Sequence, residues 1–221
     1  MVGEMPSDVP VLHRDEHLLV VDKPAGVLVV PAAGRKEPSL VDRLTQQLGQ
    51  RVYAVHRLDE DTTGCLAFAL DERAKEALDR TFRDHAAVRD YLALTTAVPS
   101  PESGCVESHL KEGPDGVVRV VPRGGKRAVT HYETLARRGR GSLVRCRLET
   151  GRRNQIRVHM AELGCPIVGD RKYGHRPSRE AGRRRRGALL LHAASLALDH
   201  PRDGRRLHVQ APCPWAEPEQ N

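Results

Sequence analysis

The sequence predicts an α+β fold with a large, mixed but mainly antiparallel sheet and a few flanking helices. Short apolar runs rich in valine and leucine recur along the chain, from LLVVD at 18–22 to RLHVQ at 206–210, and they have the length and composition of strands. Only three segments place apolar residues at helical spacing. Runs of strands interrupted by occasional helices are typical of α+β domains.

The first part of the chain is expected to contribute four strands. The turn Lys23-Pro24-Ala25-Gly26 separates the first two, and a polar loop from His56 to Gly64 separates the last two. Each strand is therefore bounded by residues that favour turns. The four expected strands lie at 18–22, 27–30, 52–55 and 65–70.

Two helices are expected in the same region, each with a capping residue at its N-terminus. Ser39 has the character of an N-cap, with Asp42 three residues on, and Gly49 can end the helix. Asp71 can cap the second helix. The apolar positions that define the two helices are Leu40, Leu44 and Leu48 in the first, and Ala74, Leu78 and Phe82 in the second.

Strands dominate the rest of the chain, with one further helix around 153–163. Residues 1–221 are expected to form a single domain, of one or two lobes, with a core from about 12 to 212. The chain begins too close to its first strand for an additional N-terminal domain to be expected. The remaining strands are expected at 88–97, 105–110, 117–121, 128–137, 142–150, 189–200 and 206–210.

Composition favours a protein without a membrane span that binds a polyanion. The formal net charge is +7 and the isoelectric point about 9.5, although a genome rich in arginine codons would give the same balance. No apolar run approaches the length of a membrane span, and the N-terminus lacks the pattern of a secretory signal. Five dispersed cysteines without a CxxC pair suit reduced thiols and give no zinc site. A cytoplasmic protein without a metal is expected.

A basic segment at 171–186 carries eight lysine or arginine residues and one acid. Its glycines and proline predict an exposed loop, which is expected to contact phosphates unless it is only a solvated insertion. Aromatic residues make up 3% of the chain, too few for a platform on which bases stack. Any RNA is therefore expected to be held through phosphates and one deep pocket.

The polar loop between the strands at 52–55 and 65–70 concentrates charged residues. It carries three acids, Asp59, Glu60 and Asp61, within three positions. Asp61 and its threonine neighbours fit the ordinary role of turn formers. Asp59 differs because Arg57 and Leu58 hold it beside a strand end, where functional side chains are rigidly placed. Asp59 is therefore a candidate catalytic carboxylate.

A second polar cluster opens the helix expected at 153–163. Arg153 and Arg157 are four residues apart and therefore share one face of the helix. Helix N-termini and guanidinium groups both favour anions. A solvated basic face would give the same pattern, so the cluster alone leaves its function open.

Together these segments resemble the RluA-type pseudouridine synthases. The matching motifs are VVDKPAGVLVVP, HRLD with DTTG, TGRRNQIRVHM, GDRKYG and LLLHA, in the family's order and over most of the chain. The resemblance implies the pseudouridine synthase fold, in which a sheet in two lobes flanks a central RNA-binding cleft. It implies no metal and no organic cofactor. The chain resembles a short form without the S4 RNA-binding domain.

The resemblance also assigns the catalytic residues. Asp59 takes the place of the family's catalytic aspartate, and Tyr91 in RDYLAL that of the tyrosine against the target base. Arg157 in QIRVH matches the basic residue that pairs with the aspartate, and Leu191 is a plausible apolar residue of the pocket. Asn154 stands where the family usually has histidine.

The substrate is expected to be ribosomal or transfer RNA with a uridine flipped out of its stack. Arg57 can fill the vacated place or contact a phosphate, and Arg153, Asn154 and Gln155 are expected to bind the RNA. Arg89 replaces a lysine that the family often has two residues before the tyrosine. A monomer is expected.

Asp59 can act in two ways, and the sequence does not choose between them. It can attack the sugar or base as a nucleophile, or remove the 2′ proton to give a glycal. Tyr91 can offer its ring and hydroxyl, or can be an ordinary core tyrosine. Two other functions remain open: a non-catalytic RNA-binding protein with this fold, and a base-releasing glycosidase that also uses Glu60 or Asp61.

Overall fold

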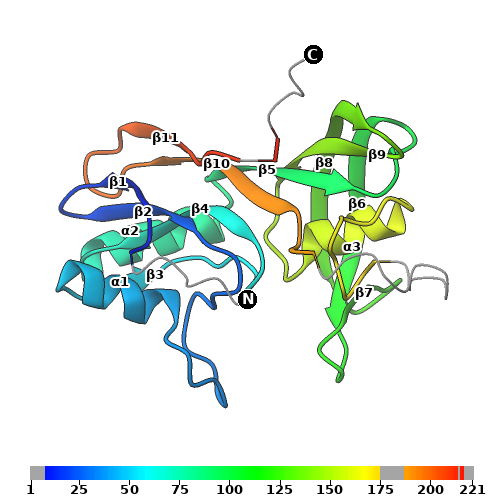
Figure 1. The fold of residues 1–221 in the computed structure, drawn as a ribbon. Coiled ribbons are helices and arrows are strands. Elements are labelled where there is room, and N and C mark those ends of the chain that lie inside the picture. Colours follow the sequence, from blue (N-terminus) through cyan, green and yellow to red (C-terminus); the bar gives the residue numbers. More distant parts are fainter. Residues whose placement is uncertain (1–7, 175–186, 214, 217–221) are drawn as a thin grey trace. The chain divides into compact units, whose positions relative to one another are not determined.

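The computed structural model describes residues 8–174, 187–213 and 215–216, which form two compact units (Figure 1). Unit 1 comprises 8–87 with 193–212, and unit 2 comprises 88–174, 187–192 and the described residues from 213 onward. Both units combine sheets with few helices, so the α+β prediction is confirmed. Of the basic segment 171–186, residues 175–186 lie outside the described part.

Unit 1 is built on a sheet whose central strands are buried on both faces. The strands β1 (Val11–Arg14), β2 (Leu18–Lys23), β4 (Thr63–Ala69) and β10 (Leu191–Asp199) lie in that order. β3 (Tyr53–Ala54) pairs with β4, and β11 (Arg206–Gln210) pairs with β10. β2 and β4 are antiparallel, from Leu18 opposite Ala69 to Lys23 opposite Gly64.

Both helices of unit 1 begin at the predicted caps, and the first also ends where its sequence predicts. α1 (Leu40–Leu48) carries a capping box, in which Ser39 Oγ accepts from the Asp42 N–H and Asp42 Oδ2 accepts from the Ser39 N–H. Gly49 ends it in the left-handed conformation, with φ of 65°. α2 (Glu72–Arg83) is capped by Asp71, whose Oδ1 accepts from the Ala74 N–H.

The strand expected at 27–30 is absent, and this prediction was wrong. Val27 and Val29 are buried, as their apolar character suggests. The carbonyls of Leu28 and Val29 accept the N–H groups of Leu40 and Val41 at the start of α1. These bonds satisfy donors that a helix N-terminus otherwise leaves unpaired, so the segment closes the helix end and pairs with no strand.

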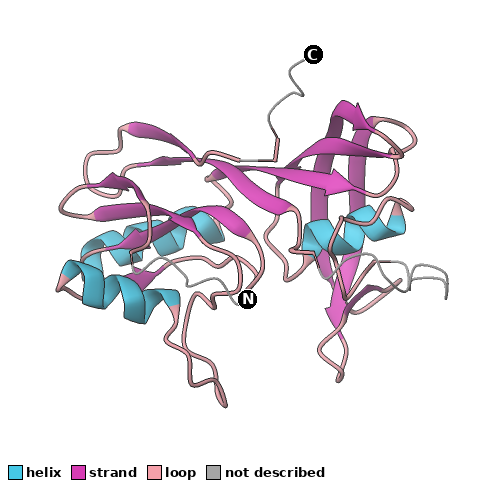
Figure 2. Cartoon of the chain, in the orientation of Figure 1, coloured by secondary structure: helices cyan, strands magenta, loops and turns pink. Residues whose placement is uncertain are grey.

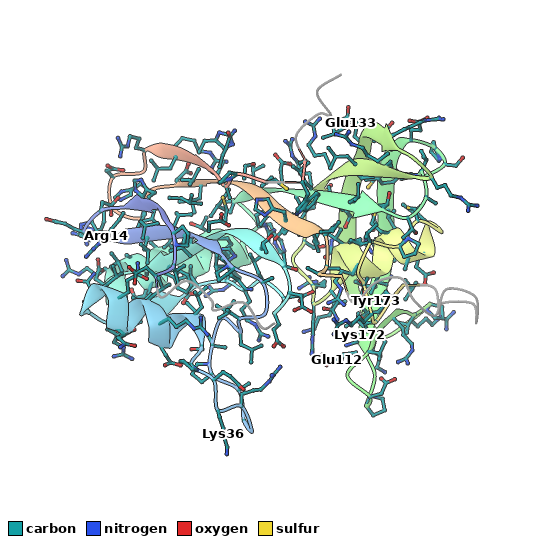
Figure 3. The ribbon with its side chains drawn as sticks, viewed as in Figure 1. Arg14, Lys36, Glu112, Glu133, Lys172 and Tyr173 are labelled. Atoms are coloured by element: carbon teal, nitrogen blue, oxygen red, sulfur yellow. The ribbon has the colours of Figure 1, made fainter. Side chains whose placement is uncertain are left out.

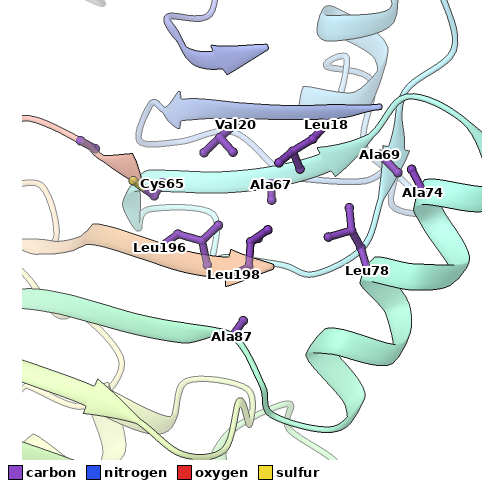
Figure 4. Close-up of a cluster of buried hydrophobic side chains, with 11 residues drawn as sticks. Leu18, Val20, Cys65, Ala67, Ala69, Ala74, Leu78, Ala87, Leu196 and Leu198 are labelled. Atoms are coloured by element: carbon purple, nitrogen blue, oxygen red, sulfur yellow. The ribbon is translucent and has the colours of Figure 1, made fainter. Parts of the chain in front are cut away.

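One hydrophobic cluster of unit 1 lies between the sheet and α2 (Figure 4). Leu78 of α2 packs with Leu18 and Val20 of β2 and with Leu196 and Leu198 of β10, all 2% exposed or less. Burial of these branched side chains stabilises the unit. The remaining buried members of the cluster are Cys65, Ala67, Ala69, Ala74, Ala87 and Ala211.

Unit 2 is an antiparallel sheet with α3 (Gln155–Glu162) packed against it (Figure 2). Val158 of α3 packs against Leu110, Val118 and Ala128 of the sheet. Burial alternates along β5 (Val88–Thr95), the first strand of this unit, so every second side chain faces the interior, and Tyr91 is one of these. The strand order is β5, β9 (Gly141–Leu148), β8 (Lys126–Arg138), β6 (Ser103–Glu112) and β7 (Val118–Val120).

No described helix has the length and apolar character that crossing a membrane requires.

Candidate active site

Asp59 lies in a tight turn between β3 and β4 of unit 1. The Asp59 carbonyl accepts the Thr62 N–H at 3.1 Å, and Leu58 anchors the turn in the interior at 8% exposed. Asp59 itself is half-buried, whereas Arg57 is exposed. The carboxylate therefore lies at the surface of a well-anchored loop, and Arg57 has the exposure that an RNA contact needs.

The buried Lys23 fixes the backbone of this loop through hydrogen bonds. Its ammonium is fully buried and donates to the carbonyls of Glu60 at 2.7 Å and Pro24 at 2.8 Å. The Gly26 N–H donates to the same Glu60 carbonyl at 3.0 Å. Burial lowers the pKa of Lys23 to about 8, while the carboxylates of Asp61, Asp59 and Glu60 oppose the shift. Lys23 thus fixes the loop's backbone and places a positive charge near its acids.

The two other acids of the loop, Glu60 and Asp61, have different surroundings from Asp59. Both Glu60 carboxylate oxygens accept from Arg35 Nη2, at 2.8 and 2.7 Å. Asp61 is exposed. A glycosidase would need a second carboxylate that is available for a water molecule, and the Arg35 ion pair reduces the availability of Glu60.

Two further residues shape the loop without acting chemically. His56 Nε2 accepts the Ala67 N–H at 3.0 Å, and its ring stacks on Phe82 at 4.0 Å. Gly64 has φ of 104°, and a Cβ there would lie 2.3 Å from the Ala193 carbonyl oxygen. His56 therefore supports the packing, as expected for a histidine beside a strand, and only glycine fits at 64.

Tyr91 and Arg89 project from the same face of β5 in unit 2. Tyr91 is 7% exposed and Arg89 is 9% exposed. Within the described residues, Nε and Nη2 of Arg89 have no hydrogen-bond partner. Burial of Tyr91 suits either a pocket wall or a core position, so its catalytic role stays a prediction.

Arg157 of α3 is held by an aspartate that lies in the segment after the helix. Its Nε and Nη2 donate to Asp170 Oδ2 and Oδ1 at 2.8 and 2.9 Å, a bidentate pair whose carboxylate is 1% exposed. Burial raises the pKa of Asp170, but the Arg157 guanidinium and the N–H groups of Tyr173 and Lys172 outweigh it and hold that pKa below its ordinary value. The orientation of Arg157 is therefore fixed within unit 2.

Asn154 extends this network. Its Oδ1 accepts from Arg157 Nη1 at 3.2 Å, and its Nδ2 donates to Tyr173 Oη at 2.9 Å. The Tyr173 hydroxyl also accepts the Val118 N–H at 3.0 Å, and the Arg157 guanidinium lies over the tyrosine ring at 5.2 Å. Asn154 has φ of 55°, a left-handed conformation that asparagine tolerates better than most residues. Asn154 thus positions Arg157.

The other residues predicted on α3 differ in their surroundings. Gln155 is 2% exposed, its Oε1 accepts from Thr150 Oγ1 and its Nε2 donates to the Val129 carbonyl. These bonds favour a structural role over the predicted RNA contact. Arg153 is exposed and forms an ion pair with Glu112. Arg153 therefore keeps the exposure that RNA binding requires.

Two buried residues, Leu191 and His159, complete the comparison with the predicted site. Leu191 is 4% exposed at the start of β10, which fits a pocket wall. His159 is fully buried between Thr130 Oγ1 at 2.9 Å and Ser108 Oγ at 3.0 Å, and burial lowers its pKa to about 4. These contacts give His159 a structural role.

The predicted residues divide between the two units. Asp59 and Arg57 lie in unit 1, whereas Tyr91, Leu191 and the residues at the start of α3 lie in unit 2. The structure brings together Gln155 and Arg157 on α3 with Asn154, its N-cap, and Arg153, which precedes the cap. Sequence reasoning missed Lys23 and Asp170, although the motifs VVDKPAGVLVVP and GDRKYG contain them. In the described ranges, no three His, Cys, Asp or Glu side chains gather as a metal ion would require.

The class of protein follows from the comparisons with known proteins. Residues 17–162 match the sequence model of the RNA pseudouridylate synthase family, and the chain belongs to this family. It is an RNA pseudouridine synthase, an isomerase that converts uridine in RNA to pseudouridine.

Curated relatives support this assignment over nearly the whole chain. The chain is 37% identical over 218 residues to the RNA pseudouridine synthase YlyB of Bacillus subtilis (strain 168), covering 95% of this chain and 70% of that protein. It is 38% identical over 228 residues to ribosomal large subunit pseudouridine synthase D of Zymomonas mobilis, covering 95% and 71%.

A solved structure agrees as well. Human RNA pseudouridylate synthase domain containing 4 superposes with a TM-score of 0.77 at 29% identity, covering 93% of this chain and 89% of that one. The pseudouridine synthase fold predicted from the motifs is therefore confirmed.

Proposed function

We propose that this enzyme isomerises specific uridines in ribosomal or transfer RNA, with Asp59 as its essential carboxylate. The observation that carries the proposal is the anchoring of the Asp59 loop by the buried Lys23, which fixes the backbone from which the carboxylate projects. The C1′–N1 bond breaks, the uracil rotates and a C5–C1′ bond forms. C5 loses a proton and N1 gains one, so the mass of the RNA is unchanged.

Asp59 starts this reaction in its ionised form. As a nucleophile it bonds to the sugar or the base and is later displaced, and as a base it removes the 2′ proton. Either route needs an oriented carboxylate. We propose that Arg157 pairs with Asp59, and the bidentate bond from Arg157 to Asp170 supports this because it restricts the arginine to one orientation.

The remaining predicted residues complete the substrate site. Tyr91 offers its ring to the flipped base and its hydroxyl to the proton that leaves C5. Arg57, which is exposed, takes the place of the flipped base or contacts a phosphate. Leu191 lines the pocket for the base, and Arg153 and Asn154 bind the RNA. The enzyme is proposed to act as a monomer in the cytoplasm, which light scattering and fractionation test.

Asp59→Asn tests the chemistry because it keeps the shape of the side chain and removes its charge. Tritium release from RNA labelled at C5 of uridine is expected to be abolished, while the unfolding midpoint and the Kd for RNA stay near those of the unchanged protein. Asp61→Asn, a neighbouring exposed acid, is the matched control and should retain activity. Activity of Asp59→Asn equal to that control would remove the basis of the mechanism.

The class of RNA is tested separately. Deletion of the gene and mapping of pseudouridines in total RNA should show a loss at particular positions of ribosomal or transfer RNA. A loss confined to another class of RNA would contradict the assignment.

A further inference from the structure

Unit 2 contains a basic pocket whose charged residues, apart from Arg153, do not belong to the proposed substrate site. We call it the basic pocket and define it by four cations and one acid. Its volume is about 320 Å³, near the lower end of the range of about 300–1,000 Å³ found for small-ligand sites. The charged residues that line it are Lys111, Lys126, Arg152, Arg153 and Glu112.

The two lysines come from adjacent strands. Lys126 begins β8 opposite Leu110 of β6, and Lys111 follows Leu110. Both are exposed, and within the described residues neither ammonium has an ion-pair partner. Lys126 shares the face of the sheet on which Leu110 lies, whereas Lys111 projects from the other face of β6. Both lysines line the pocket, so both charges attract an anion within it.

Three glycines and two apolar residues form the rest of the wall, namely Gly124, Gly125, Gly151, Leu110 and Val118. A Cβ at Gly125 would lie 3.0 Å from the Leu110 carbonyl oxygen, and one at Gly151 would lie 2.7 Å from Arg89 Nη1. The packing around these two glycines therefore leaves no room for a side chain. The lining contains no aromatic ring on which a base could stack. The chemistry of the pocket therefore fits a phosphate group better than a base.

Arg89 lies next to the pocket but is not part of its lining. Its guanidinium lies against Gly151, which lines the pocket, and the side chain is 9% exposed. Two of its nitrogens, Nε and Nη2, lack a partner among the described residues. A buried cation with unsatisfied donors is unfavourable, and a nearby anion offsets this.

Glu112 opposes anion binding within the same pocket. Its carboxylate forms an ion pair with Arg153 (Figure 3 labels Glu112). An incoming phosphate must compete with Glu112 for this guanidinium. The glutamate therefore limits how tightly the pocket binds phosphate.

We propose that the basic pocket binds a phosphodiester group of the RNA substrate, with Lys111, Lys126 and Arg153 as its ligands and Glu112 as a built-in competitor. The inference rests on the RNA-modifying function of the enzyme. It adds to that function an anchoring site that takes no part in the chemistry.

The first test removes the two lysines and measures binding without any reaction. The probe is a labelled oligoadenylate, which contains no uridine. In Lys111→Gln/Lys126→Gln we expect its Kd to rise about fivefold at low salt, and the slope of log K against log salt to shrink by about 0.7 for each lost contact. Arg140→Gln/Arg202→Gln removes two exposed charges outside the lining and should change the slope less. Equal changes in both variants would overturn the proposal.

The second test predicts a gain of binding. Glu112→Gln should lower the Kd for the same RNA about twofold to threefold, because Arg153 becomes available to phosphate. Glu102→Gln breaks a comparable exposed ion pair with Arg137 outside the pocket and removes the same charge. If Glu102→Gln strengthens binding as much, net charge and not the pocket explains the effect.

The source of the phosphate is distinguished by competition at constant ionic strength. Inorganic phosphate should displace the RNA from the unchanged protein more than from the double lysine variant. Equal displacement would contradict a phosphate site here. The proposal and the enzyme's function fail separately, because Asp59→Asn tests the chemistry and these measurements use RNA that cannot react.

Discussion

At the scale of single residues, Lys23 shows how a buried charge can hold a reactive loop in place. Its ammonium has two carbonyl acceptors, one of them the Glu60 carbonyl in the Asp59 turn. Burial lowers its pKa to about 8, so the lysine is still mostly protonated at neutral pH. The ammonium therefore fixes the backbone and contributes positive potential beside Asp59.

Lys23→Met should separate this role from simple packing. Methionine keeps the apolar stem but removes the donors, so we expect the kcat for tritium release to fall about tenfold or more. The free energy of unfolding should fall by about 1–2 kcal/mol because a buried carbonyl loses a donor. In Lys75→Met, which removes an exposed partner of Asp79, both quantities should change little. An unchanged kcat in Lys23→Met would mean that the loop keeps its shape without the ammonium.

The same residues show what sequence reasoning reaches at this scale. Asp59 could be proposed as a catalytic residue from the sequence because its signal is local: charged residues are concentrated beside a strand end. The partner of Lys23 is 37 residues away, and the Val129 carbonyl bound by Gln155 is 26 residues away. Only the folded chain brings such pairs together, so Lys23 was missed and Gln155 was assigned to RNA.

At the scale of elements, Arg157 near the start of α3 is oriented by residues that lie outside the helix. Asp170 and Asn154 contact Arg157 on different atoms, and Tyr173 packs beneath the guanidinium. The helix alone would leave a long side chain with many rotamers. The segment after it supplies the restraint.

Asp170→Asn should therefore impair catalysis through Arg157. Asparagine can still accept N–H bonds but cannot form the charged pair, so we expect kcat to fall roughly tenfold to a hundredfold while KM for RNA changes less. Asp115→Asn removes an exposed aspartate that pairs with Arg119 in the same unit, and its kcat should be unchanged. A change in KM alone would assign Asp170 to RNA binding and not to positioning.

Elements are predictable from sequence where their determinants are local. The N-caps Ser39 and Asp71 and the end at Gly49 were predicted because a cap acts within three or four residues. The segment 27–30 has the composition of a strand, but its carbonyls are used by α1. Composition cannot show which neighbour a backbone carbonyl will find.

At the scale of the whole molecule, stability should depend on pH through buried His159. Its pKa in the folded state is about 4, below the ordinary value of 6.5. Between these values the unfolded chain binds a proton that the folded chain excludes, so this contribution to stability is lost as the pH falls from 6.5 to 4. Urea unfolding should show the decline, and it should be smaller in His159→Gln, which cannot titrate. An equal decline in both proteins would assign it to other groups.

The α+β class was predictable for the molecule as a whole, because it depends on the number and spacing of apolar runs. The sequence did not predict which segments of the chain make up each of the two units. Unit 1 combines 8–87 with 193–212, and nothing in the sequence of either stretch indicates that it packs with the other. Long-range pairing of this kind depends on which sheet edges remain open after local folding.

The divided composition of unit 1 has a consequence for synthesis on the ribosome. The chain emerges from its N-terminus, so β4 is complete long before β10, its neighbour in the sheet, has been translated. The strands of unit 2, β5 to β9, are contiguous in the chain and become available in the interval. Part of an apolar strand edge in unit 1 must therefore stay unpaired until more than a hundred further residues have been made, which takes on the order of 5–20 s at typical elongation rates. During that time the nascent chain depends on whatever shields the open edge, such as the ribosome surface or a chaperone.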